Sequence, residues 1–162
     1  MTRLNKIFGI VLGIFIFCVT SVQAAEYTKF SKKFINAFED CQKYEETVYS
    51  DYEGKSFTTK RQIHGWRNRY CLYEETISSG QDKYQLSCRF TNVQMDELYE
   101  AMKVRSKDII RHDLELFVEQ VDPKTGEIKY VTAGTTTISG NKPFITWAKY
   151  QNNPYFCSRK KL

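Results

Sequence analysis

The chain has 162 residues, a formal net charge of +5 and an aromatic content of 15%. This length suits one domain, and the charge is too small to predict a nucleic-acid-binding domain, since such domains concentrate Lys and Arg on one face. The sequence contains no Cys-x-x-Cys motif and no glycine-rich phosphate loop, so we predict no metal and no cofactor.

The first 24 residues have the pattern of a signal peptide. A basic segment containing Arg3 and Lys6 precedes an apolar run over 7–19, and small residues follow in 20–24. The apolar run is shorter than the roughly 20 residues that a membrane-spanning helix needs. We therefore predict cleavage after Ala24, contact with the membrane only during export, and a periplasmic or secreted bacterial protein that consists of residues 25–162.

Four cysteines remain after this cleavage, and an even number in an oxidising compartment predicts two disulfides: Cys41, Cys71, Cys88 and Cys157. Residues 70–77 and 82–90 are typical of two strands joined around Ser79-Gly80. That turn sets Cys71 opposite Cys88 at a position where side chains are close. We therefore prefer bridges 71–88 and 41–157. The alternative joins Cys71 and Cys88 separately to Cys41 and Cys157.

The segments that follow the signal peptide predict a helix and then a sheet. Apolar residues at helical spacing from Phe30 to Cys41 predict an amphipathic helix over 28–41. Tyr-, Thr- and Val-rich segments separated by turns then predict an antiparallel meander of about four strands, over 44–50, 56–66, 70–77 and 82–90. A three-residue turn at 67–69 would set Ile63 opposite Tyr73 and Arg61 opposite Glu75, a favourable cross-strand pairing.

The last third of the chain predicts further helices with one ambiguous segment. Thr91 begins a helix, with Gln94 completing a capping box. The apolar residues of 106–121 fit a helix, although the turn at 122–126 and the residues that follow could close a hairpin instead. We prefer the helix. A short strand at 135–138 and a short helix started by Pro143 complete a single, small, disulfide-stapled α+β domain.

A helix followed by a four-stranded meander is similar to the arrangement in cystatins. The inhibitory hairpin of that family carries Gln-x-Val-x-Gly, whereas Gln62 is followed by glycine after three positions here, and the valine is missing. The resemblance therefore implies a type of fold and no inhibitory motif.

Catalytic and metal-binding patterns are weak. A helix over 106–121 would align Asp108, His112, Glu115 and Glu119 in a stripe that could hold a divalent cation, but an acidic face opposite an apolar face is the ordinary amphipathic pattern. Neither histidine lies in a nucleophile motif. The paired carboxyls of 45–46 and 74–75 point to opposite faces of a strand, so they do not form catalytic pairs. We predict no catalytic residue.

A binding role is the interpretation that this leaves. Tyr and Trp combine apolar area with a polar tip, and Trp66 lies between Gly65 and Arg67, with Arg69 across the predicted turn. Arginine grips carboxylates and phosphates bidentately and stacks on aromatic rings. We predict a non-catalytic binding module that uses Trp66, Arg67 and Arg69 to bind a protein or an anionic envelope polymer. The alternatives are a small carboxylate-dependent envelope hydrolase, which requires a deep cleft with two carboxyls, and an inhibitor of a hydrolase.

Overall fold

The computed structural model describes residues 28–52, 54–105 and 107–162. The predicted signal peptide and its cleavage site lie outside these residues. Within them the chain has the predicted α+β architecture, with three helices, a five-stranded antiparallel sheet and a separate two-stranded sheet. No helix in these ranges is long and apolar enough to cross a membrane.

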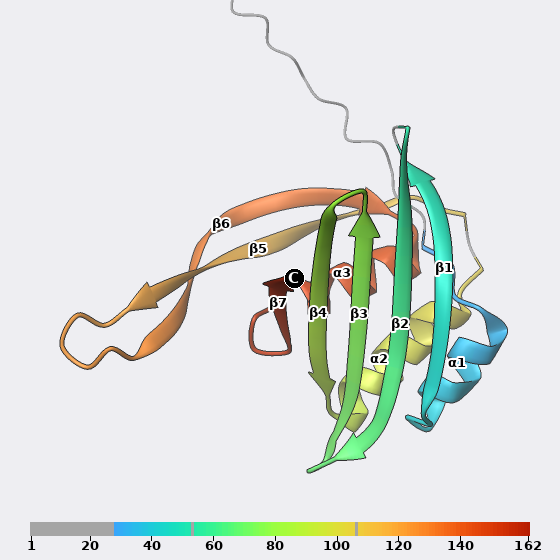
Figure 1. Cartoon of the computed structure of the whole chain (residues 1–162), viewed down its shortest axis with the longest axis horizontal. Coiled ribbons are helices and arrows are strands. Elements are labelled where there is room, and N and C mark those ends of the chain that lie inside the picture. Colours follow the sequence, from blue (N-terminus) through green and yellow to red (C-terminus); the bar gives the residue numbers. More distant parts are fainter. Residues whose placement is uncertain (1–27, 53, 106) are drawn as a thin grey trace, which may run out of the picture.

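The five-stranded sheet and three helices form the body of the molecule. Its strands follow the order β1 (Tyr44–Tyr52), β2 (Lys55–Arg67), β3 (Tyr70–Ser79), β4 (Asp82–Phe90) and β7 (Cys157–Lys161). Helices α1 (Lys32–Glu39), α2 (Asn92–Lys103) and α3 (Lys142–Gln151) lie on one face of this sheet (Figure 1). The predicted order of a helix and then a four-stranded meander is confirmed, and the C-terminal strand adds a fifth member.

Aromatic side chains fill the space between the sheet and the helices. Trp147 of α3 is almost fully buried, and its ring centroid lies 5.1 Å from that of Tyr73 and 5.4 Å from that of Phe38. Phe34 and Phe90 are buried beside it. Aromatic pairs at such distances contribute beyond the burial of their area, so this cluster explains how lysine-rich α1 is held although no acidic residue lies in its first turn.

The helices begin at side chains that cap them. The Ser31 hydroxyl accepts a hydrogen bond from the backbone of Phe34 at 2.9 Å, so α1 starts at Lys32 rather than at residue 28. The predicted capping box of α2 is confirmed, with the Thr91 backbone donating to Gln94 Oε1 at 2.7 Å. The predicted role of Pro143 in the first turn of α3 is also confirmed.

The register of β2 and β3 agrees with the prediction but arises differently. Ile63 pairs with Tyr73 and Arg61 with Glu75, as expected. The turn has two residues rather than three, since Arg67 pairs with Tyr70. The remaining residue is taken up by a bulge between Ile63 and Gly65, which shifts the register by one position.

The preferred disulfide pairing is wrong, and the alternative is confirmed. The bridges join Cys41 to Cys71 and Cys88 to Cys157. The prediction placed the β3–β4 turn one residue too early. Ser79 pairs with Asp82, and Gly80 adopts a positive φ of 59° in the turn between them. This shift moves Cys88 opposite Tyr73 instead of Cys71, and Cys88 faces Cys157 on its other neighbour, β7.

The preferred helix over 106–121 is also wrong. Strands β5 (Ile110–Val121) and β6 (Ile128–Gly140) pair antiparallel along their whole length, and the predicted short strand at 135–138 lies within β6. Asp122 fixes the turn because its side chain accepts hydrogen bonds from the backbone of Lys124 and Thr125. On a strand, His112 and Glu115 point to opposite faces, so the acidic stripe considered for a cation does not form.

Candidate functional site

The three residues predicted as a contact lie at an exposed end of the sheet, around the β2–β3 turn. Trp66 is 47% exposed, and its indole N–H donates to the carbonyl of Asp40 at 3.1 Å. Asn68 and Arg69 form the turn with positive φ values of 49° and 70°. Arg67 and Arg69 are exposed, and neither forms an ion pair with another described residue. The structure therefore brings Trp66, Arg67 and Arg69 together at one end of the sheet.

The β5–β6 hairpin forms an arm that leaves the body beyond β7, with its turn at the far end (Figure 1). Leu114 is the only side chain of β5 that is buried. Five large aliphatic side chains farther along the arm are between 39% and 58% exposed, namely Leu116, Val118, Val121, Ile128 and Val131. Four of them pair across the ladder, with Val118 opposite Val131 and Val121 opposite Ile128, and Leu116 lies opposite Gly134.

The strands of the arm are not covered by helices as the five-stranded sheet of the body is, and most of their side chains are exposed. A two-stranded hairpin alone is at best marginally stable in water, and packing on another element usually stabilises it. Contiguous exposed apolar side chains commonly mark surfaces that bind another molecule. The arm also has two free strand edges, which offer unpaired backbone groups to another chain. These features point to the arm as a binding element.

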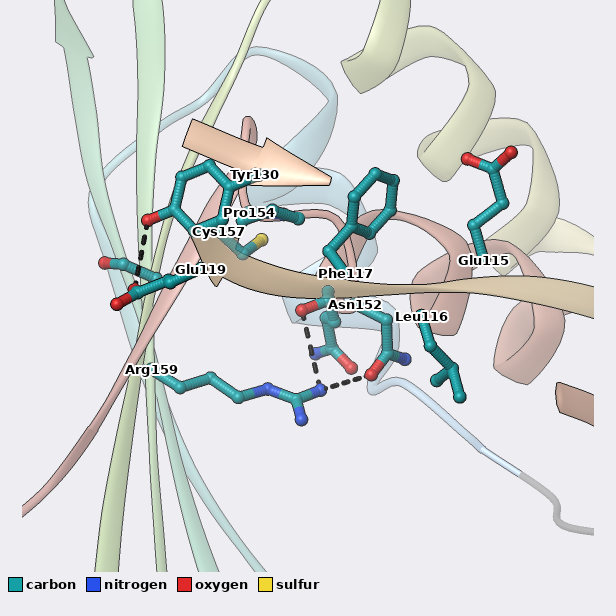
Figure 2. Close-up of a pocket in the computed structure, with 11 residues that line it drawn as sticks. Glu115, Leu116, Phe117, Glu119, Tyr130, Asn152, Pro154, Cys157 and Arg159 are labelled. Carbon is teal, nitrogen blue, oxygen red and sulfur yellow. Dashed lines mark hydrogen bonds between the residues drawn. The ribbon is translucent and has the colours of Figure 1, made fainter. Parts of the chain in front are cut away.

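A groove of about 360 Å³ lies where the arm joins the body (Figure 2). Residues of β5 form one wall, and Cys157, Ser158 and Arg159 of β7 contribute to the other. The Arg159 guanidinium donates to Asn152 Oδ1 at 2.7 Å and to the carbonyl of Gln151 at 3.5 Å. The groove is therefore lined by an arginine whose position is fixed by the C-terminal end of α3.

An aromatic contact holds the base of the arm against the body. The ring centroid of Tyr155 lies 6.2 Å from that of Phe117 and 5.8 Å from that of Tyr130. The Tyr155 hydroxyl also donates to the carbonyl of Tyr130 at 3.4 Å. This contact fixes the direction in which the arm leaves, while the strands beyond it gain no comparable support.

The carboxylates at the groove do not form the pair that a hydrolase needs. Glu115 and Glu119 both come from β5, and Figure 2 shows them at opposite ends of the groove. Four residues along a strand correspond to about 13 Å, more than the roughly 5–9.5 Å between the carboxyls of glycosidases. The Tyr130 hydroxyl donates to Glu119 at 3.4 Å. The described residues of the groove therefore do not provide the carboxyl pair of a glycosidase.

The buried ionisable groups belong to the core rather than to the groove. Arg61 pairs with Glu46 at 3.2 Å and lies over the Phe30 ring, 4.5 Å from its centroid. Glu75 accepts hydrogen bonds from the Tyr73 hydroxyl at 2.9 Å and from Gln151 at 3.0 Å. Burial, reinforced by Glu75, raises the pKa of Tyr73 well above its ordinary value. These contacts join β1, β2, β3 and α3 beneath the helices.

The sequence predicted a candidate contact at the β2–β3 turn, and it gave the β5–β6 hairpin only as the alternative to a helix. The signal for the arm was the run of β-branched residues over 128–138 after a strong turn, which is typical of a strand. Comparisons of the chain with protein-family models, with curated proteins and with solved structures give no match.

Proposed function

We propose that the protein is an exported, non-catalytic binding module whose β5–β6 arm is its main contact with a protein partner. The observation that carries this proposal is the set of exposed, cross-strand-paired aliphatic side chains on the arm. The two disulfides fit an oxidising compartment, where such bridges form and persist. A periplasmic or secreted location follows as part of the proposal.

The charge of the arm favours a protein over an anionic polymer at this contact. Over residues 110–140, five acidic side chains outnumber three Lys and Arg side chains, so a polyanion would be repelled along most of the arm. Aliphatic side chains on both faces of a ribbon fit against apolar protein surface. The free edges add backbone hydrogen bonds if the partner contributes a strand.

The β2–β3 turn is proposed as a second contact for an acidic group of the partner or for an anionic envelope polymer. Its arginines are exposed, and Trp66 is held in place by its hydrogen bond to Asp40. If the partner is a hydrolase and the module its inhibitor, cleavage of the 66–69 turn should abolish inhibition. Under this proposal, Trp66→Ala and Arg67→Ala weaken binding of the partner even when the arm is unchanged.

Cross-linked capture from the compartment where the protein resides tests the proposal. The variant Val118→Lys/Val131→Lys places two charges on the exposed arm and leaves the core untouched. The matched control is Tyr49→Lys/Val93→Lys, which adds two charges at exposed side chains of the body. We expect wild type and control to capture the same partner and the arm variant to lose it. Equal capture by all three proteins would refute the role of the arm.

A further inference from the structure

A second cavity, of about 490 Å³, lies where three distant segments meet. Its lining comes from residues around the start of α1, from Met102, Val104, Arg105 and Lys107 at and after the end of α2, and from Asn141 and Pro143 at the start of α3. Its apolar surface is formed by Phe30, Ile35, Met102, Val104 and Pro143. Volumes of 300–1,000 Å³ with mostly apolar linings are typical of small-molecule sites.

The charged residues that line this cavity are basic in the part of the chain that the structure describes. They are Lys29, Lys32, Arg105 and Lys107, and no carboxylate from 28–52, 54–105 or 107–162 contributes to the lining. Among the described residues, Lys29, Lys32 and Arg105 form no ion pair. Basic side chains around one apolar cavity attract an anion and strengthen its binding where the walls exclude water.

One of these positive charges, that of Lys32, does not stabilise the helix that carries it. Lys32 occupies the first position of α1, and neither α1 nor α3 has an acidic residue in its first turn. Positive charge near a helix N-terminus is unfavourable, because the helix dipole is positive there. A bound anion would interact favourably with both Lys32 and the positive end of the helix dipole. This interaction would offset the unfavourable position of the lysine.

We propose that this cavity binds a single-chain anionic amphiphile of the fatty-acid class. The acyl chain lies on the apolar surface and the carboxylate lies among the basic side chains. A free phosphate would leave the apolar surface uncovered, and a neutral lipid would leave Lys29, Lys32 and Arg105 without a counter-charge. A fatty acid covers the apolar surface with its chain and places its carboxylate beside the basic side chains. The inference goes beyond the proposed function and does not depend on the arm.

Calorimetric titration of the purified, delipidated protein with octanoate, laurate and palmitate tests the chemistry. We expect the affinity to rise with chain length, by up to about fourfold per buried methylene. Dodecanol, which has the chain of laurate but no charge, should bind at least about fivefold more weakly than laurate. Absence of laurate binding, or equal binding of dodecanol, would overturn the proposal.

Charge reversal tests the site. Lys32→Glu/Arg105→Glu should weaken laurate binding by at least about tenfold. Lys83→Glu/Lys124→Glu makes the same change in net charge at exposed positions outside the cavity lining, and it should leave the affinity unchanged. Thermal melting of each variant establishes that it is folded, and laurate should raise the melting temperature of wild type and control alone. Equal affinity of both double variants overturns the assignment.

A spin-labelled stearate tests where the ligand binds. Sedimentation tests whether a second copy of the chain covers the cavity instead. In NMR spectra the label should broaden amide signals of residues 29–35 and 102–105 and spare those of the arm turn. Broadening elsewhere without broadening here would overturn the proposal. So would a wild-type dimer that Lys32→Glu/Arg105→Glu converts to a monomer, because the cavity would then be covered by a second copy of the chain.

Discussion

The body and the β5–β6 arm both contain long antiparallel ladders, yet they bury their side chains very differently. In the body, buried residues of β2, β3 and β4 alternate with more exposed ones, and the buried set, which includes Arg61 and Glu75 beside the apolar residues, packs under three helices. In the arm, one residue of β5 is buried and the aliphatic residues beyond it face water. Both disulfides join parts of the body, and neither reaches the arm.

The body is stabilised by its own buried core, whereas the arm leaves apolar surface exposed that a partner could cover. The body has a core of its own, with Phe34, Phe38 and Phe90 completely buried. The arm has hydrogen bonds between its strands but little apolar burial, and hydrogen bonds contribute modestly when water competes for them. The arm should therefore be the least stable described part of the molecule until another surface covers it.

Removal of the disulfides should have the largest effect. In the loop-entropy model, losing the Cys88–Cys157 bridge, which closes a separation of 69 residues, costs about 4.4 kcal/mol. Losing the Cys41–Cys71 bridge, with a separation of 30 residues, costs about 3.6 kcal/mol. Paired Cys→Ala variants and denaturant unfolding measure both. Peptide mapping without reduction provides the control, and a linked 71–88 peptide would contradict the pairing.

A matched pair of leucines tests the comparison directly. Leu98 of α2 is 0% exposed and Leu116 of the arm is 44% exposed. Leu98→Ala should lower the free energy of unfolding by about 2–5 kcal/mol, because it leaves a cavity in the core. Leu116→Ala should cost less than about 1 kcal/mol. Equal losses in urea unfolding would mean that the arm is packed as tightly as the body.

Hydrogen exchange should reveal the same difference without any substitution. Backbone amides of β5 and β6 are paired across the ladder as those of β2 and β3 are. Opening the arm exposes little apolar surface, so its amides should exchange at least about tenfold faster than those of β2 and β3. Addition of the partner should slow amide exchange in β5 and β6 and leave exchange in β2 and β3 unchanged. Uniform protection of all four strands would contradict the comparison.

The smallest expected effect lies within the body, at the contact between α2 and α3. Partial burial opposes ionisation of Glu97, but hydrogen bonds from Tyr150 and Lys149 outweigh it, so the pKa of Glu97 lies below its ordinary value of 4.5. Its contribution to stability is therefore present above this ordinary value and disappears as the pH falls through the lowered pKa. Because Glu97 is partly exposed, this contribution is small.

Glu97→Gln removes the titration and should flatten the loss of stability below about pH 4.5. Asp96→Asn removes the same charge from the neighbouring residue and serves as the control. Urea midpoints measured across acidic pH compare the two variants. Identical profiles for Glu97→Gln and wild type would show that the contact between the helices contributes nothing to acid stability.

Local patterns predicted most of the body, because its elements bury the side chains that define their periodicity. The meander followed from alternation and turn signals, whereas the cross-strand pairs of Arg61 and Ile63 agree with the prediction because a bulge offsets the error in turn length. A shift of one residue in the turn at Gly80 was enough to misassign the disulfides. The partner of Cys88 is 69 residues away on β7, and no local pattern identifies such a neighbour.

The arm was missed for the opposite reason. Helical periodicity is informative when an apolar face packs against a core, and the apolar residues of 110–121 are mostly exposed, so their spacing does not report a buried face. The β2–β3 turn could be predicted as a site because its residues are adjacent in the sequence. The groove and the second cavity each combine segments that meet only in the folded chain.

The connectivity of the bridges has a consequence for biogenesis. Of the four cysteines in the body, the first joins the second and the third joins the fourth. If the chain is exported as proposed, an oxidase that links each thiol to the next one to emerge during translocation produces the native pattern directly. In that case the protein should mature without a disulfide isomerase, because the order in which its cysteines emerge already matches their pairing.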